Sequence, residues 1–424
     1  MTSTRTVVKN VSFLDTETLA VNENQTIVIQ HGKFSWIGDE GSFEEQDQDT
    51  IINGEGKFAI PGLFDMHVHL SYEQADLQKR GQFILRRKEE YADLLGVKHA
   101  AQYLKIGVTT VRGCGGRKSL ASLRQLINEG KLLGPRLKLA LSTVVQPGNQ
   151  EYFGTQAMID DLRNKEPISG KDGIIHTVRS RKADGSDHIK TTTTGGVLHG
   201  KTSDVTQSLW TDEELEAMVS EAERIGMYVA AHAHQTSGIN AAVRAGVRTI
   251  EHSTILDEET IKLMLDKGTY ITPTQSAGTY IYHMDNSYRQ GLPPEVISKW
   301  ELVSEKMVES HKLAHEQGVP LTLGTDAPVA GDHAHTNLEM QLMANHLDMS
   351  PYEVIKSGTL ISAEAMKMGE LLGSISLGKF GDLVLLNQDP RDNIDIFMNV
   401  ENIDTVLKEG QIVSQQGKLN SNFF

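Results

Sequence analysis

Eight short apolar runs alternate with helical patterns along most of this 424-residue chain. The segments between the runs, such as 209–227 and 255–268, carry Thr or Asp caps followed by apolar residues three and four apart, as amphipathic helices do. Eight strands that alternate with helices over about 250 residues or more are typical of a (β/α)8 barrel, the α/β fold that we predict. The runs span residues 62–70, 108–113, 136–143, 187–193, 227–234, 247–253, 269–274 and 319–327.

An open, doubly wound sheet is the main alternative to a barrel. The usual reason for such a sheet is a dinucleotide, but no G-x-G-x-x-G sequence follows any of the eight runs. The glycine-rich stretches at 112–116 and 194–196 are more typical of tight turns between a strand and a helix than of phosphate-binding loops. The barrel is therefore favoured.

Both ends of the chain carry β-like runs separated by turn residues. In the first 57 residues, His31-Gly32 separates two apolar runs as a hairpin turn does, and similar runs return at 382–390 and 404–419. Each end is too short to bury much apolar surface alone, so we expect both to meet in one small β-sandwich. The predicted domains are residues 1–57 and 366–424, which form the β-sandwich, and residues 58–365, which form the barrel.

The charge balance and the single cysteine exclude several classes of function. The chain has 41 Lys and Arg against 56 Asp and Glu, a net charge of −15, which argues against nucleic acid or a membrane surface as a partner. Cys114 is the only cysteine, so a bound metal must use nitrogen and oxygen ligands. The sequence has no apolar run of about 18 residues and no apolar segment typical of a signal peptide, so we expect a cytoplasmic protein.

Ionisable residues stand at the carboxyl ends of the predicted strands, where the active sites of such barrels lie. His67 and His69 are two residues apart, so both side chains leave a strand on the same face. Each residue alone is more often structural, but burying so many polar groups at one mouth is unfavourable unless a divalent cation coordinates them. The candidates are His67, His69, Lys190, His232, His252 and Asp326.

Four imidazoles and a carboxylate exceed the protein ligands of one catalytic zinc ion, which usually takes about three. Two metal ions about 3.5–4 Å apart fit better, but they need a bridging anion, and the ammonium group of a lysine repels cations. The conflict is resolved if carbon dioxide has carboxylated Lys190, which turns the side chain into an anionic bridge. We therefore expect two divalent metal ions, zinc first among them, and a carboxylated Lys190.

These residues resemble the motifs of the amidohydrolase superfamily, in its form with two metal ions and a carboxylated lysine. The similarity is strongest to prolidase-like proteins, which include Xaa-Pro dipeptidases, zinc carboxypeptidases and relatives of imidazolonepropionase. It covers nearly the whole chain and implies a barrel with a small β-domain made by both ends. The motifs are HVH at 67–69, Lys190, His232, EH at 251–252 and TDA at 325–327, together with the phrases IPGLFDMHVHL and LGSISLGKFGDLVLLNQDP.

The resemblance also implies a role for each candidate ligand. His67 and His69 would bind one metal ion, which Asp326 would also contact, His232 and His252 would bind the other, and Lys190 would bridge the two. A hydroxide held by two metal ions would attack a carbonyl group, and Asp326 could accept the proton that the bound water loses and pass it to the departing nitrogen. We expect a metal-dependent hydrolase of amide bonds, a dipeptidase or carboxypeptidase that acts on dipeptides or N-acyl amino acids.

Two other functions are consistent with the same residues. The first is a hydrolase of cyclic amides, similar to imidazolonepropionase, or a deaminase; deaminases with one metal ion do not need Lys190, so the metal content discriminates. The second is a catalytically silent scaffold. Such a scaffold would have lost metal ligands, and none of the expected ligands is missing from the sequence.

The long connections at 70–105, 143–186 and 274–300 either surround the substrate or form contacts between subunits. We expect a small molecule or short peptide as substrate and a homo-oligomer as the assembly. A substrate with a free carboxylate needs a cation or a hydroxyl donor to bind it. The candidates for substrate contacts are Arg112, His199, His234, Tyr282 and Arg289.

Three further histidines need an interpretation. His234 differs from some prolidase-like relatives, which resemble H-A-Y where this chain has H-A-H. We expect it to contact the substrate or the metal ligands, with a structural role as the alternative. His311 and His315 are four residues apart in a helical pattern, but no Glu follows His311 as the zinc-protease motif requires. We expect both of these residues on a solvent-exposed helix face.

Overall fold

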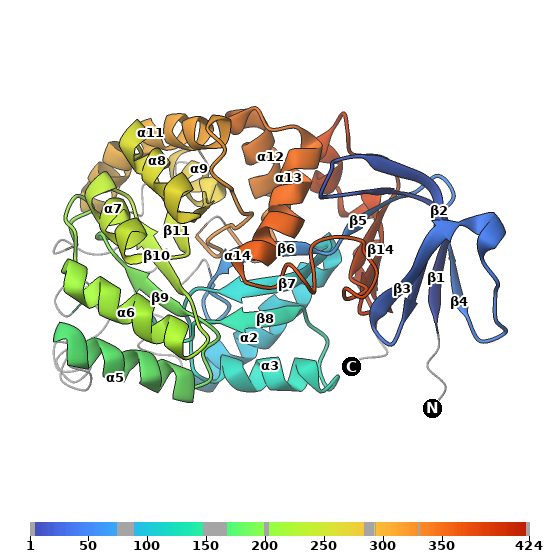
Figure 1. Cartoon of the computed structure of the whole chain (residues 1–424), viewed down its shortest axis with the longest axis horizontal. Coiled ribbons are helices and arrows are strands. Elements are labelled where there is room, and N and C mark those ends of the chain that lie inside the picture. Colours follow the sequence, from blue (N-terminus) through green and yellow to red (C-terminus); the bar gives the residue numbers. More distant parts are fainter. Residues whose placement is uncertain are drawn as a thin grey trace.

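The computed structural model of the chain describes residues 5–73, 89–146, 168–198, 203–283, 292, 294–329 and 331–420 (Figure 1). Parallel strands lie in the middle of the molecule with helices on their outer side. Strands from both ends of the chain form a separate sheet at one end of the molecule (right in Figure 1).

Seven of the eight predicted barrel strands form in the described ranges. They make two parallel sheets, with the strand orders β6-β7-β8 and β12-β11-β10-β9. The strands are almost entirely buried, because helices cover their outer face and side chains fill the interior. The strands are β6 (Leu63–Val68), β7 (Val108–Gly113), β8 (Arg136–Leu139), β9 (Ile189–Thr192), β10 (Val229–Ala233), β11 (Thr249–His252) and β12 (Tyr270–Thr272).

The eighth predicted run, 319–327, closes the barrel without forming a regular strand. The N–H of Thr322 donates to a carbonyl in β12 at 2.8 Å, and the N–H of Met66 in β6 donates to the carbonyl of Leu323 at 2.8 Å. At the other gap, the N–H of Val144, just after β8, donates to a carbonyl in β9 at 2.8 Å. The fold prediction, a (β/α)8 barrel with a small β-domain, is confirmed.

Helix boundaries follow the signals in the sequence. Helix α6 (Asp212–Arg224) begins with a capping box between Thr211 and Glu214, and α8 (Glu258–Lys267) begins at Asp257, which accepts from the N–H of Thr260 at 2.8 Å. Gly268, with φ of 66°, ends α8. The other α-helices are α2 (Glu89–Tyr103), α3 (Leu120–Asn128), α5 (Gly170–Ala183), α7 (Thr236–Ala245), α9 (Gln275–His283), α11 (Pro294–Glu316), α12 (Thr336–Leu347), α13 (Pro351–Lys356) and α14 (Ser362–Ala365).

Short helices of other types complete the connections. The helix η3 (Ser357–Ile361) is a π-helix between α13 and α14. The 3-10 helices are η1 (Glu40–Ser42), η2 (Leu104–Ile106), η4 (Ile394–Met398) and η5 (Val400–Asn402). Among the described residues, every helix is too short or too polar to cross a lipid bilayer.

The small β-domain is one sheet built from both ends of the chain. Its order is β16-β15-β14-β13-β5-β1-β2-β3, with β4 paired to β1. The antiparallel pair of β13 and β5 joins the C-terminal strands to the N-terminal ones. The strands are β1 (Thr6–Leu14), β2 (Val21–Gln30), β3 (Lys33–Asp39), β4 (Thr50–Asn53), β5 (Phe58–Pro61), β13 (Leu383–Leu386), β14 (Ile403–Lys408), β15 (Gln411–Gln415) and β16 (Lys418–Leu419).

The domain boundaries remain proposals. Strand β5, at residues 58–61, pairs inside the small sheet, and β6 begins the barrel two residues later. The boundary proposed at residue 57 falls just before β5.

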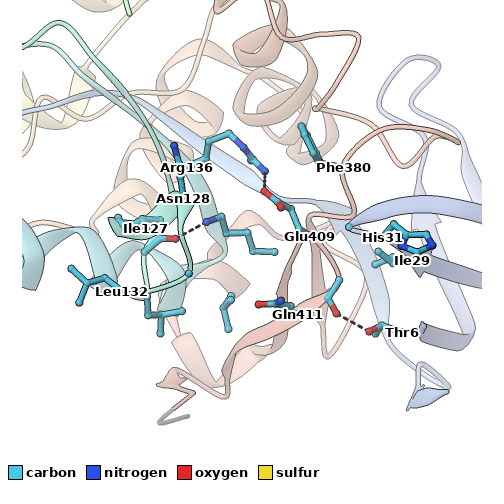
Figure 2. A pocket seen from close by; sticks show the side chains of 17 residues that line it. Thr6, Ile29, His31, Ile127, Asn128, Leu132, Arg136, Phe380, Glu409 and Gln411 are labelled. Atoms are coloured by element: carbon cyan, nitrogen blue, oxygen red, sulfur yellow. Dashed lines mark hydrogen bonds and ion pairs between the residues drawn. The ribbon is translucent and has the colours of Figure 1, made fainter. Parts of the chain in front are cut away.

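A pocket of about 750 Å³ lies where the small domain meets α3 and the start of β8 (Figure 2). Arg136 crosses this junction: its guanidinium donates to Asp382 at 2.8 Å and to Glu409 at 2.6 Å, and it lies 4.8 Å from the ring centroid of Phe380. Because Arg136 is the first residue of β8, this junction lies at the amino ends of the strands, away from their carboxyl ends.

Candidate metal centre

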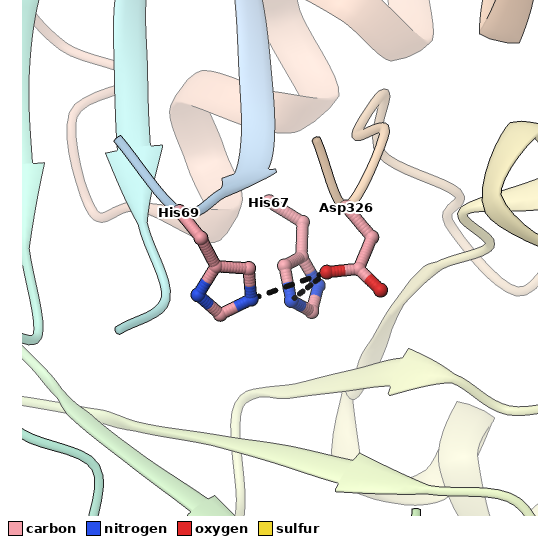
Figure 3. A group of neighbouring side chains, drawn as sticks. All are labelled: His67, His69 and Asp326. Atoms are coloured by element: carbon pink, nitrogen blue, oxygen red, sulfur yellow. Dashed lines mark ion pairs between the residues drawn. The ribbon is translucent and has the colours of Figure 1, made fainter. Parts of the chain in front are cut away.

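His67, His69 and Asp326 meet at the mouth of the barrel (Figure 3). His67 belongs to β6, His69 follows it, and Asp326 belongs to the irregular eighth run. Oδ1 of Asp326 lies 3.3 Å from Nε2 of His67 and 3.1 Å from Nε2 of His69. The His67 side chain is 1% exposed, whereas Asp326 is 15% and His69 25% exposed, so the group opens toward solvent on one side.

The other three candidate ligands lie close to this group and come from β9, β10 and β11, which carry Lys190, His232 and His252. Lys190 in β9 is buried, and its Nζ lies 3.3 Å from Nε2 of His67. The ring centroid of His252, at the end of β11, lies 5.2 Å from that of His67 and 4.5 Å from that of His232 in β10. The structure therefore brings all six predicted metal ligands together.

The backbone at two of these residues has an uncommon conformation. His252 has φ of 73° and Asp326 has φ of 58°, both in the left-handed region that non-glycine residues rarely adopt. Such strained positions cluster at functional sites, because the surrounding structure must hold them in place. His252 is held by Thr274, whose Oγ1 lies 2.7 Å from its Nδ1.

The charge states of these groups suit a metal ion. Burial, together with the charge on Lys190, lowers the pKa of His67 to about 4, and burial holds the pKa of His252 well below its ordinary value. Burial alone would raise the pKa of Asp326, but its close contacts with His67 and His69 and the neighbouring Lys190 lower it to about 2. Neutral imidazoles and an ionised carboxylate are the forms that bind a cation.

Glu251 is a site residue to which the sequence analysis gave no role. Its carboxylate is fully buried, and Oε2 lies 2.9 Å from Nδ1 of His67. The only signal in the sequence was its place in the EH motif beside His252. In a strand, neighbouring residues point to opposite faces, so the motif alone gives no reason for both side chains to reach the site.

Arg112 is not placed to contact a substrate, which corrects the prediction made for it. Its side chain is fully buried inside the barrel, and Nη2 donates to both carboxylate oxygens of Glu251, at 2.7 and 2.8 Å. Nη1 donates to Thr249 at 2.8 Å. Because Arg112 stands near the end of a strand, we predicted that its side chain lies at the mouth of the barrel. In the structure the side chain points into the barrel interior instead.

Cys114 gives the structure a second group of possible metal ligands. Its sulfur and side-chain atoms of His67 and Glu251 lie within 4.8 Å of one another, deep in the barrel. Burial raises the pKa of the Cys114 thiol to about 11, so the thiol stays protonated, whereas a metal binds the thiolate. The mouth of the barrel is therefore the better cation site.

The prediction that His311 lies on an exposed helix face is wrong. His311 is fully buried, and its Nε2 lies 2.6 Å from the carbonyl oxygen of His252, the candidate ligand. The sequence contained the signal, because Val303, Met307, His311 and Ala314 recur at helical spacing and form the buried stripe of α11. His315, one turn further on, is partly exposed.

The other predicted substrate contacts have different outcomes. His234 is buried beside the candidate ligands: its ring lies 4.5 Å from that of His232 and is stacked on that of His252 at 5.2 Å. His199 and Arg289 lie outside the described residues. Tyr282 belongs to α9, but its side chain is also outside the described part of the chain.

Known proteins are similar to this chain over most of its length. Residues 58–413 match the model of the amidohydrolase family. A crystal structure of a Xaa-Pro dipeptidase with bound methionine in the active site is 32% identical, with a TM-score of 0.83, and the match covers 96% of this chain and 99% of that one. An ochratoxinase of Aspergillus niger is 25% identical over 93% of this chain and 84% of its own length. An imidazolonepropionase of Shewanella frigidimarina is 22% identical over 96% of this chain and 97% of its own.

Proposed function

Because the chain belongs to the amidohydrolase family, we propose that it is a metal-dependent hydrolase of amide bonds, a dipeptidase or carboxypeptidase for dipeptides or N-acyl amino acids. The observation that carries this proposal is the convergence of four imidazoles, one carboxylate and a buried lysine on one mouth of the barrel. In a (β/α)8 barrel, this is the face on which catalysis occurs.

The donor set supports two metal ions. His67, His69 and Asp326 would hold one ion, and His232 and His252 would hold the other. Lys190, carboxylated by carbon dioxide, would bridge them; its position 3.3 Å from His67 supports this role. Zinc is the proposed metal, because imidazole and carboxylate ligands suit it.

Two cations, when bound, would supply a water of lowered pKa and would polarise the carbonyl group of the substrate. The side chains of the protein would transfer the proton and exclude bulk water. Asp326 faces the partly open side of the mouth, where it would accept a proton and deliver it to the departing nitrogen. The buried wall of the site, which includes His67 and His252, keeps bulk water away from one side of the reacting groups.

The substrate class rests on the likeness to the Xaa-Pro dipeptidase structure, which is 32% identical to this chain. A free carboxylate on the substrate would need a donor at the mouth, and His234 is the described candidate. His199, Tyr282 and Arg289 stay proposed contacts. A homo-oligomer and a cytoplasmic location also stay predictions.

A cyclic-amide hydrolase is the second candidate. It is supported by the imidazolonepropionase that matches over 96% of this chain. Lys190 would have no role in a deaminase with one metal ion. We therefore favour a deaminase less than a cyclic-amide hydrolase.

The test is a substrate screen with the zinc-loaded protein. We expect release of a C-terminal amino acid from some dipeptides or N-acyl amino acids, and loss of this activity in His67→Asn. The matched control is His176→Asn, which changes an exposed histidine on α5 and should retain activity. Hydrolysis of cyclic amides alone would favour the second candidate, and activity that survives His67→Asn would contradict the proposed site.

A further inference from the structure

The geometry points to Glu251 as a positioning residue for His67, with Arg112 holding Glu251 in place. This inference rests on the proposed function, because it concerns how a candidate metal ligand is oriented. Both side chains are fully buried, below the mouth of the barrel, and neither has a role in the mechanism above.

The two ring nitrogens of His67 have different surroundings. Nδ1 lies 2.9 Å from Oε2 of the buried Glu251 carboxylate, within ion-pair distance, and an anion beside that nitrogen favours the tautomer that carries the ring proton on Nδ1. Nε2 then presents its lone pair to the mouth, where it lies 3.3 Å from both Lys190 and Asp326. This is the tautomer that a metal ion at the mouth requires.

Arg112 and Thr249 hold the Glu251 carboxylate in place. Nη2 of Arg112 donates to both carboxylate oxygens, at 2.7 and 2.8 Å, and the hydroxyl of Thr249 donates to Oε1 at 2.5 Å. Arg112 also donates from Nε to the carbonyl of Met66, the residue before His67, at 2.5 Å. The guanidinium therefore fixes the carboxylate and the backbone of the ligand strand together.

The alternative is that this ion pair only stabilises the barrel. Removing one partner of any buried ion pair destabilises a protein, so a loss of stability does not distinguish the two roles. Metal affinity and the tautomer of His67 do distinguish them, because a merely structural pair affects neither.

The experiment measures zinc affinity in Glu251→Gln by competition between the zinc-loaded protein and a chromogenic chelator. Partners that orient a metal-binding histidine typically contribute about 10- to 100-fold in affinity, and we expect a loss of that size. The matched control is Asp382→Asn, which breaks the buried pair with Arg136 at the other end of the barrel. It should lower stability and leave zinc affinity unchanged.

A second measurement needs no change at Glu251. Nitrogen-15 NMR of histidine-labelled protein, with the His67 signals assigned by comparison with His67→Asn, should show the proton of His67 on Nδ1. A proton on Nε2, or unchanged zinc affinity in a folded Glu251→Gln, would overturn the inference while wild-type protein still binds zinc. Wild-type protein that binds no zinc would instead contradict the proposed function.

Discussion

Asp326 lies close to both histidines of the HVH motif through one carboxylate oxygen. Its Oδ1 lies within 3.3 Å of both His67 and His69. Although the residue is largely buried, its contacts with His67 and His69 hold its pKa low, and its side chain retains some exposure to solvent. The proposed function gives it two roles, contact with a cation and proton transfer to the substrate.

Replacing Asp326 with Asn should remove the proton acceptor while changing the shape of the side chain little. We expect kcat to fall by about 10²- to 10⁴-fold at saturating zinc, which is the usual contribution of general acid–base catalysis. The control is Asp332→Asn, which changes an exposed acid six residues further along the chain. A kcat within about twofold of wild type would show that Asp326 carries no proton.

At the scale of elements, helix α11 packs against the candidate site through the buried His311. His311 contacts the carbonyl of His252, and its Nδ1 lies 3.2 Å from the side-chain amide of Gln275 at the start of α9. Glu339 of α12 accepts from the N–H groups of Gln275 and Ser276, at 2.8 and 2.7 Å. Two helices thus fix the start of α9 and the strained end of β11.

The two histidines of α11 give a matched test of this support. His311→Ala should lower the free energy of unfolding by about 1–3 kcal/mol, because it leaves buried polar groups without a partner. His315→Ala, at a partly exposed position, should change it by less than about 0.5 kcal/mol. The check is urea denaturation of both variants; equal effects would mean that α11 is not anchored through His311.

At the scale of the whole molecule, the β-domain and the barrel are joined by Arg136 as well as by the chain itself. Its contacts reach Asp382, just before β13, and Glu409, just after β14. Asp382 is buried, so its charge depends on Arg136 for compensation.

Arg136→Met should therefore destabilise the protein by about 3–5 kcal/mol, the usual result of leaving one buried charge unpaired. The barrel mouth lies at the other ends of the strands, so kcat of the protein that remains folded should not change. Chemical denaturation and a kinetic assay on the same preparation check both parts. A normal stability, or a large loss of kcat, would contradict this picture of the junction.

The sequence predicted the barrel and the six candidate ligands because both follow from local rules. Alternation of strands and helices indicates the fold, and the carboxyl ends of parallel strands must share one rim. Residues such as Arg112, Glu251 and His311 were misjudged or given no role because their partners are distant in the sequence. The direction of a side chain and its contacts inside the barrel depend on tertiary packing. Local sequence patterns do not indicate that packing.

The central claim is that the mouth of the barrel binds two metal ions that the reaction requires. Metal analysis combined with chelation and reloading tests it most directly. We predict two equivalents of divalent metal per chain, loss of activity after exhaustive chelation, and recovery when zinc and bicarbonate are returned together. Full activity in protein that has been freed of metal would contradict the account.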